Sequence, residues 1–267
     1  MKAALLADNR GVALIVTLAV ITVAVTAALE INRQARSDAA AAAVARDRFT
    51  LSQMAASGIH LAMALLVKDR RESTVDSVQE TWAGPLEDYL ADFPFESGGL
   101  EVEIYDERAK IQVNALVRYP QGSQVNPAQY RIWTRFARQL ATSAEVPTDI
   151  DPMAVVHGLK DWLDRGDNDA VTGLSGAESD YSQSLTPPYD CRNGPIPHLG
   201  ELVLVKGVSE TLFDAAGGLN GLSRYLTVYG VGLSGATFDG RVNINTADVS
   251  VLGAILPETH AHLAQSI

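Results

Sequence analysis

The sequence predicts an α+β protein in which a long N-terminal helix carries a small antiparallel sheet and a large inserted domain that is mainly helical. Residues 12–29 contain no charged side chain and are almost entirely apolar, which indicates a helix. Apolar and polar residues alternate at 100–105 and 110–116, as is typical of half-buried strands. At residues 128–142 the apolar side chains fall on one face of a helix, and further helices are expected up to residue 226. A chain of 267 residues has room for one or two domains with a core.

The composition is acidic, with 21 Lys and Arg against 32 Asp and Glu and a net charge of −11. Such a chain has no broad basic field for the phosphates of a nucleic acid, so we expect no nucleic acid partner. The single cysteine, Cys191, permits no internal disulfide. We also expect no enzyme activity and no catalytic residues, because the five histidines are dispersed and no nucleophile motif is present.

The N-terminus combines a short leader with an apolar run. Residues 1–11 end in Arg10 and Gly11, and residues 12–29 then form a helix about 27 Å long, enough to cross the hydrocarbon core of a membrane. A glycine directly before such a run is typical of the site that a prepilin peptidase cuts. We therefore expect cleavage between Gly11 and Val12, with the apolar helix retained. The pattern alone also permits a secretory signal peptide cut near Ala28, a plain signal anchor or a buried core helix.

The helical pattern continues beyond the apolar run, from residue 30 to about residue 67. This stretch has no proline and one glycine, Gly58, and its apolar residues recur on one face. We expect its outer half to pack against a globular head, although a membrane-anchored coiled coil fits the same spacing. Together with a hairpin formed by 100–105 and 110–116, it makes a stem at residues 30–119.

A mainly helical domain is predicted at residues 128–226, after a linker at 120–127. Its longer helices are expected at 128–142 and at 152–163, the second opening with Asp151 as cap and Pro152 in its first turn. Residues 164–197 then form an irregular loop that is longer than most structureless connections. Shorter helices are expected at 199–206, 209–216 and 219–226.

The irregular loop concentrates acidic side chains among glycines. Carboxylate oxygens on a flexible loop are the ligands that calcium prefers. The spacing is not that of an EF-hand, because Val171 and Thr172 stand where that motif needs Asp or Asn and then Gly. On the residues alone, a solvated acidic loop is an equally good interpretation. The candidate metal ligands are Asp164, Asp167, Asp169, Glu178 and Asp180, with Asp161 and Asn193 as weaker candidates.

Residues 227–267 are predicted to form a Gly-rich connection followed by an end that resembles a helix-hairpin-helix unit. The segment 230–235 fits G-x-G-x-x-G, but a turn-like stretch follows where a dinucleotide site needs a helix. The segment 242–247 looks like the start of a helix-hairpin-helix unit, with Thr246 as the helix cap. In DNA-uptake proteins such units bind phosphates. No Gly-rich hairpin with basic neighbours follows here, so a structural or protein-binding use is favoured.

Short motifs, in order along nearly the whole chain, carry a family resemblance. They lie at 10–14, 95–99, 106–107, 113–116, 161–164, 176–181, 188–189, 201–202, 205–208 and 242–247. Each motif is weak alone, but in this order and spacing the chain resembles the minor pseudopilin K of type II secretion systems (the general secretion pathway protein K family). Val16 agrees with the resemblance. Most pilins and pseudopilins have Glu as the fifth residue after the cut, whereas pseudopilin K typically lacks it, which suits a tip subunit with no neighbour above it.

The resemblance implies a function in assembly. The chain would cap the tip of the type II secretion pseudopilus and nucleate its growth, for the export of folded proteins across the outer membrane. It would span the inner membrane once with its bulk in the periplasm, and it would meet the prepilin peptidase and the inner-membrane secretion platform. Its N-terminal helix would join pseudopilins of the I and J types. The resemblance also favours calcium, as a structural ion, in the acidic loop. The alternative is a membrane-anchored, competence-type protein that binds DNA through residues 245–247.

Two features depart from the family pattern. The family usually continues through another helical stretch and closing strands, whereas this chain stops at Ile267, so the 227–267 end is predicted to be truncated. The positive-inside rule would orient the apolar helix the other way, because only Lys2 and Arg10 precede it. More arginines follow it, at Arg33, Arg36, Arg46 and Arg48. The family orientation is the one that we expect.

Overall fold

The computed structural model describes residues 10–84, 86–90, 98–142, 151–166, 171–213, 222–232 and 237–267. The chain divides into two compact units. The first unit comprises Met1–Leu66 with Leu86–Val102, and the second comprises Val67–Pro85 with Glu103–Ile267.

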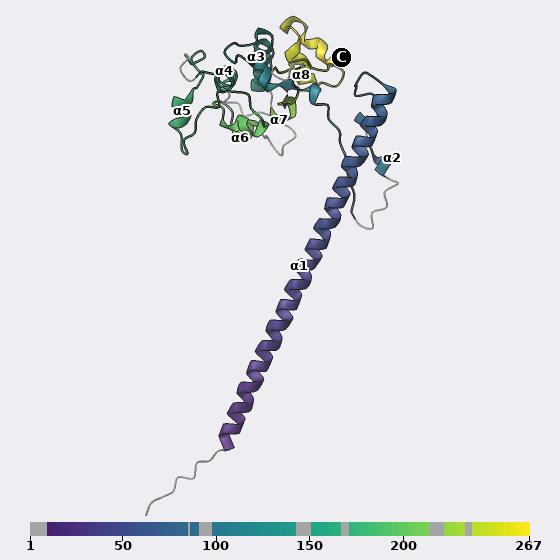
Figure 1. Cartoon of the computed structure of the whole chain (residues 1–267), viewed down its shortest axis with the longest axis vertical. Coiled ribbons are helices and arrows are strands. Elements are labelled where there is room, and N and C mark those ends of the chain that lie inside the picture. Colours follow the sequence, from purple (N-terminus) through teal and green to yellow (C-terminus); the bar gives the residue numbers. More distant parts are fainter. Residues whose placement is uncertain are drawn as a thin grey trace, which may run out of the picture. The chain divides into compact units, whose positions relative to one another are not determined.

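Helix α1 (Arg10–Glu72) is the longest element, and it confirms the predicted continuous N-terminal helix (Figure 1). It ends a little beyond the predicted limit near residue 67. Within the apolar run the threonine hydroxyls turn back to the helix itself, as where Thr22 Oγ1 donates to the carbonyl oxygen of Leu18 at 2.8 Å. Such bonds hide the few polar groups of the run and leave an apolar surface.

The first unit packs a short extended segment against α1. Met54 and Leu65 are the buried apolar residues of the helix in this unit. Gly58 faces the extended segment, and a Cβ atom there would lie only 2.9 Å from Val102 Cγ2 and 3.1 Å from Leu100 Cδ2. The one glycine of the predicted stem helix therefore lets this segment lie directly on α1. The unit also contains α2 (Glu87–Leu90).

The second unit is mainly helical. Its helices are α3 (Pro127–Thr142), α4 (Pro152–Leu163), α5 (Ser179–Gln183), α6 (Glu210–Phe213), α7 (Leu222–Tyr225) and α8 (Val249–Ile255). Strands β1 (Ile111–Gln112) and β2 (Leu226–Thr227) form a two-stranded sheet. Short 3-10 helices lie at Thr81–Ala83, Glu107–Ala109, Val113–Leu116, Leu199–Leu204 and Glu258–Ser266.

Helix α3 is the centre of this unit, because it packs against both α4 and α8. Trp133 and Phe136 on its buried face meet edge to face with ring centroids 6.2 Å apart. They join Leu163 of α4 and Val251 of α8 in one apolar core. The apolar face predicted for this helix is thereby confirmed. The bounds of α4 are those predicted, because the Asp151 side chain accepts a hydrogen bond from Met153 N at 2.9 Å and Pro152 opens the helix.

The predicted antiparallel hairpin is wrong. Residues 100–105 are in no strand, and β1 pairs with β2 in parallel, with Ile111 opposite Leu226. The segment 113–116, predicted as strand, turns into a 3-10 helix because side chains take over the backbone groups that a ladder would use. Gln112 Oε1 accepts from Ala115 N at 3.2 Å.

Asn114 also uses its side chain to make the hydrogen bonds that a neighbouring strand would make. It is buried, its Nδ2 donates to the carbonyl oxygen of Ile196 at 2.9 Å, and its Oδ1 accepts from Ile196 N at 2.8 Å. The amide thus binds a distant backbone as a neighbouring strand would, and it holds residue 196 against the core.

Other predicted elements differ in detail. The predicted irregular loop contains α5, and the predicted helix at 199–206 is a 3-10 helix. Helices α6 and α7 confirm parts of two short helices. Residues 214–221 lie outside the described residues, and Leu226, predicted to end the second helix, is in β2. The cap of α8 is Asp248, which accepts from Ser250 N at 2.9 Å, and not Thr246.

Arg135 links α3 to the end of α8. Its Nε and Nη2 donate to the carbonyl oxygens of Ala254 and Ile255, at 2.6 and 2.9 Å. These carbonyls end the helix and have no partner within it, so a guanidinium satisfies them and complements the helix dipole.

We expect Arg135→Met to lower the free energy of unfolding by about 1.5–3 kcal/mol, because two charged hydrogen bonds are lost. Thermal denaturation of the full chain in detergent measures the change. Arg131→Met on the same helix is the matched control, since Arg131 is exposed and its loss should cost less than about 0.5 kcal/mol. Equal effects of the two substitutions would contradict the assigned role.

Candidate functional site

Three buried carboxylates meet at the end of α4. Asp161 lies in its last turn, Asp164 is its C-terminal cap, and Glu178 is the residue before α5. Their exposed fractions are 0%, 1% and 6%. One carboxylate oxygen from each lies within 4.8 Å of those of the other two. We call these residues the buried acidic cluster.

Asp161 folds the loop onto the helix. Its Oδ2 accepts hydrogen bonds from Thr172 N at 3.1 Å and Ala177 N at 2.9 Å, and its Oδ1 accepts from the Thr172 hydroxyl. Gly176 sits against the same carboxylate, where a Cβ atom would collide with Asp161 Oδ2 and lie 2.8 Å from the Thr172 backbone. A buried carboxylate that accepts several hydrogen bonds is satisfied without water, and it fixes the course of the loop.

Lys160 supplies a positive charge beside the cluster. Its ammonium contacts Asp164 Oδ2 and lies 3.3 Å from Asp161 Oδ1, and only 13% of its side chain is exposed. Burial alone would lower the pKa of Lys160. The hydrogen bond and charge of Asp164, joined by those of Asp161, outweigh that effect and raise the pKa. The lysine is therefore held as a cation.

The donor set fits a hard cation such as calcium. Calcium takes carboxylate and amide oxygens at about 2.4 Å, so oxygens on opposite sides of the ion are about 4.8 Å apart. The grouped oxygens of the buried acidic cluster all lie within this distance of one another. Asn193, at a positive φ of 53°, has a buried Oδ1 with no hydrogen-bond partner among the described residues. An amide oxygen in that state is a further candidate ligand from the same loop.

The structure brings together only part of the predicted ligand set. Asp164 and Glu178 lie in the cluster, together with Asp161, which the sequence presented as a weaker candidate. Asp180 is exposed on α5 and is not one of the grouped residues. Asp167 and Asp169 lie outside the described residues. Lys160 was not singled out from the sequence, although its place four residues before Asp164 on a helix was a usable signal.

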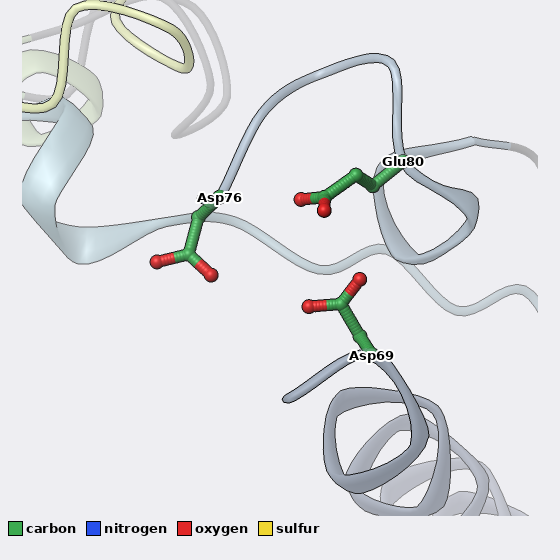
Figure 2. A group of neighbouring side chains, drawn as sticks. All are labelled: Asp69, Asp76 and Glu80. Carbon is green, nitrogen blue, oxygen red and sulfur yellow. The ribbon is translucent and has the colours of Figure 1, made fainter. Parts of the chain in front are cut away.

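A second acidic group, not singled out from the sequence, joins the last turn of α1 to the segment that follows it. Figure 2 shows the carboxylates of Asp69 and Glu80 pointing toward one another, with Asp76 to one side. Desolvation, together with the charges of Glu80 and Asp76, raises the pKa of Asp69. Glu80 is used locally, because it accepts from Ser77 N and from Trp82 Nε1. These residues are exposed or half-buried, so water screens their charges and competes for a cation.

The predicted processing site lies at the start of α1. Gly11 and Val12 are in its first turns and are exposed. By length and composition, Gly11–Glu72 contains a segment able to cross a membrane, and none of its most apolar stretch is buried within the protein.

Comparison with known proteins finds a similarity to one family. Residues 109–230, which include α3, α4, both strands and the buried acidic cluster, match the family model described as "Type II secretion system (T2SS), protein K". Type II secretion system protein K of Klebsiella pneumoniae is 24% identical over 93% of this chain and 71% of that protein. Over these residues the chain is similar to the type II secretion system protein K family.

Two further similarities agree with this match. Protein K of Aeromonas hydrophila is 28% identical over 57% of this chain, which is 45% of that protein's length. Among solved structures, a chain of the GspK–GspI–GspJ complex from enterotoxigenic Escherichia coli matches with a TM-score of 0.55 and 20% identity. That match covers 78% of this chain and 68% of the other. At this identity the structural likeness establishes a shared fold.

We expect Gly176→Ala to destabilise the second unit by about 1–3 kcal/mol, because the added methyl group meets Asp161 and the Thr172 backbone and nothing flexible can move away. Gly194→Ala is the matched control, since the nearest atom to a Cβ there is 3.9 Å away. Melting temperatures of the two variants measure the difference, and a Gly176→Ala variant as stable as Gly194→Ala would contradict the packing described.

Proposed function

We propose that this minor pseudopilin of type II secretion caps the tip of the pseudopilus and nucleates its assembly, so that folded proteins are exported across the outer membrane. The chain spans the inner membrane once, with its bulk in the periplasm, until a prepilin peptidase cuts it and it joins the fibre. Its partners are the inner-membrane secretion platform and minor pseudopilins of the I and J types. That it has no catalytic residues stays a prediction.

The observation that carries this proposal is the exposed apolar surface of α1 on a chain that is similar to protein K. Ile15, Leu18 and Val25 are more than half exposed, and they belong to a run with no charge. Such a surface must be covered by lipid or by other apolar helices. Lipid covers this surface while the helix is in the membrane, and neighbouring apolar helices cover it in the assembled fibre.

Partner identity is supported by a structural relative. The matched chain comes from a complex named for GspK, GspI and GspJ. Val16, at the place where most pseudopilins have a glutamate, is 54% exposed and presents no charge to a subunit above it. This fits a terminal position in the fibre.

The structure offers no support for the DNA-binding alternative. The polar groups of the 242–247 segment are used internally, since Asn243 Nδ2 and Thr246 Oγ1 both donate to Asp106 Oδ2, at 3.0 and 2.7 Å. A carboxylate at the centre of this network repels phosphate. The segment therefore has a structural use, joining the 106–109 turn to the approach to α8.

We further propose that the buried acidic cluster holds calcium as a structural ion, with Asp161, Asp164 and Glu178 as the residues that bind it. When bound, calcium supplies a divalent charge that offsets the repulsion between these carboxylates. The chain's own contribution is to bury three carboxylates together and to anchor the loop through Asp161. The support is the match between the donor set and calcium, described above.

Coexpression of the full chain with a prepilin peptidase should give a new N-terminus at Val12, with the apolar helix retained. Intact mass and N-terminal sequencing measure the product. A Gly11→Val variant, which changes only the residue before the cut, should stay unprocessed. A terminus near residue 29 would instead show a secreted protein, and an uncut native chain would leave only a membrane anchor.

Calcium should stabilise the protein when added after chelation. At about 100 times its dissociation constant, it should raise the free energy of unfolding by about 2.7 kcal/mol. Asp164→Asn should abolish this gain. Asp180→Asn, which removes an exposed carboxylate outside the cluster, should retain it. Loss of the gain in Asp180→Asn, or no gain in the native chain, would contradict the ligand set.

A further inference from the structure

Lys160 occupies an unusual place for a lysine. Its ammonium lies against two carboxylates of the buried acidic cluster, whose side chains are 0% and 2% exposed. It comes from the same helical turn as both partners, because Lys160 and Asp164 are four residues apart on α4. The contact therefore needs no other element to form.

A divalent cation at the cluster would need the oxygens that Lys160 contacts. The ammonium reaches Asp161 Oδ1 and Asp164 Oδ2, which belong to two of the three proposed ligands. Buried carboxylates are stabilised by a cation that pairs with them, so the ammonium and a calcium ion would compete for the same oxygens.

The nearby Lys206 does not share this role. Its ammonium donates to the carbonyl oxygen of Gly176 at 3.1 Å and lies 4.8 Å from the centre of the Tyr181 ring. It therefore binds a backbone carbonyl and an aromatic face beside the loop. The ammonium seen against Asp161 and Asp164 is that of Lys160.

We propose that Lys160 is a built-in competitor of calcium at the buried acidic cluster. This inference rests on the calcium proposal above. Without the ion, the ammonium takes a cation's place between Asp161 and Asp164 and lets the last turn of α4 form. When the ion binds, the ammonium withdraws from Asp164 along its flexible stem. Lys160 thus lowers the affinity for calcium and reduces the dependence of the fold on it.

The first test compares calcium binding by two variants of the full chain in detergent micelles, stripped of metal by a chelator. Isothermal titration should show that Lys160→Met binds calcium about 10- to 100-fold more tightly than the native chain, the range typical of groups around a metal site. The metal-free variant should also melt at a lower temperature. Lys110→Met is the matched control, because it removes the same charge from an ion pair with Glu107 elsewhere.

The outcomes separate the two proposals. If neither the native chain nor Lys160→Met binds calcium, the calcium proposal fails and this inference fails with it. If both bind calcium with equal affinity, or if Lys110→Met shows the same gain as Lys160→Met, the role of Lys160 alone is overturned.

A second test uses the native chain and does not depend on the folding of a variant. An amine-reactive reagent, read out by mass spectrometry, should label Lys160 slowly without calcium and several times faster with it, while Lys110 reacts equally in both states. Calcium binding that leaves the labelling of Lys160 unchanged would show that the ammonium is not displaced, and it would overturn the inference.

Discussion

The second unit depends on one buried charge, the carboxylate of Asp161. It is removed from water, so the cost of burying it is met by the groups around it, which are the backbone and hydroxyl of Thr172, the backbone of Ala177 and the ammonium of Lys160. The position of the loop follows from that requirement. Because the loop then continues to Glu178 and α5, the same charge also brings the remaining carboxylates together.

Elsewhere in the second unit, hydrogen bonds from polar side chains hold backbone segments together, as the ladder of a larger sheet would. The sheet has two short strands, and the backbone around it is held by Gln112, Asn114 and Arg135 through bonds to distant segments. Asp106 adds a further link, because its carboxylate accepts hydrogen bonds that join the 106–109 turn to the 242–247 segment. These bonds are specific to single atoms, so the unit reaches a defined structure with little regular secondary structure around its helical core.

The sequence predicted the elements that local signals determine. Helix α1 follows from an uninterrupted helical pattern, and α4 from a cap, a proline and an apolar face. The hairpin prediction was wrong because alternation at 110–116 indicates which side chains are buried and does not indicate the hydrogen-bond partners of the backbone. The course of the backbone here depends on the side-chain amides of Gln112 and Asn114, which bind residues more than eighty positions away. The density of acidic residues in the loop predicted Asp164 and Glu178 as ligands. No local sequence signal could show that Asp161 meets them or that Asp180 lies outside the cluster.

The end of α4 has a consequence for how the helix and the loop are stabilised. A helix C-terminus carries partial negative charge and is stabilised by basic residues, yet the last turn of α4 and its cap carry Asp161 and Asp164. Lys160 in the same turn and the loop groups that donate to Asp161 offset these two carboxylates. The helix end and the loop therefore stabilise each other through one carboxylate, and removal of Asp161 would loosen both.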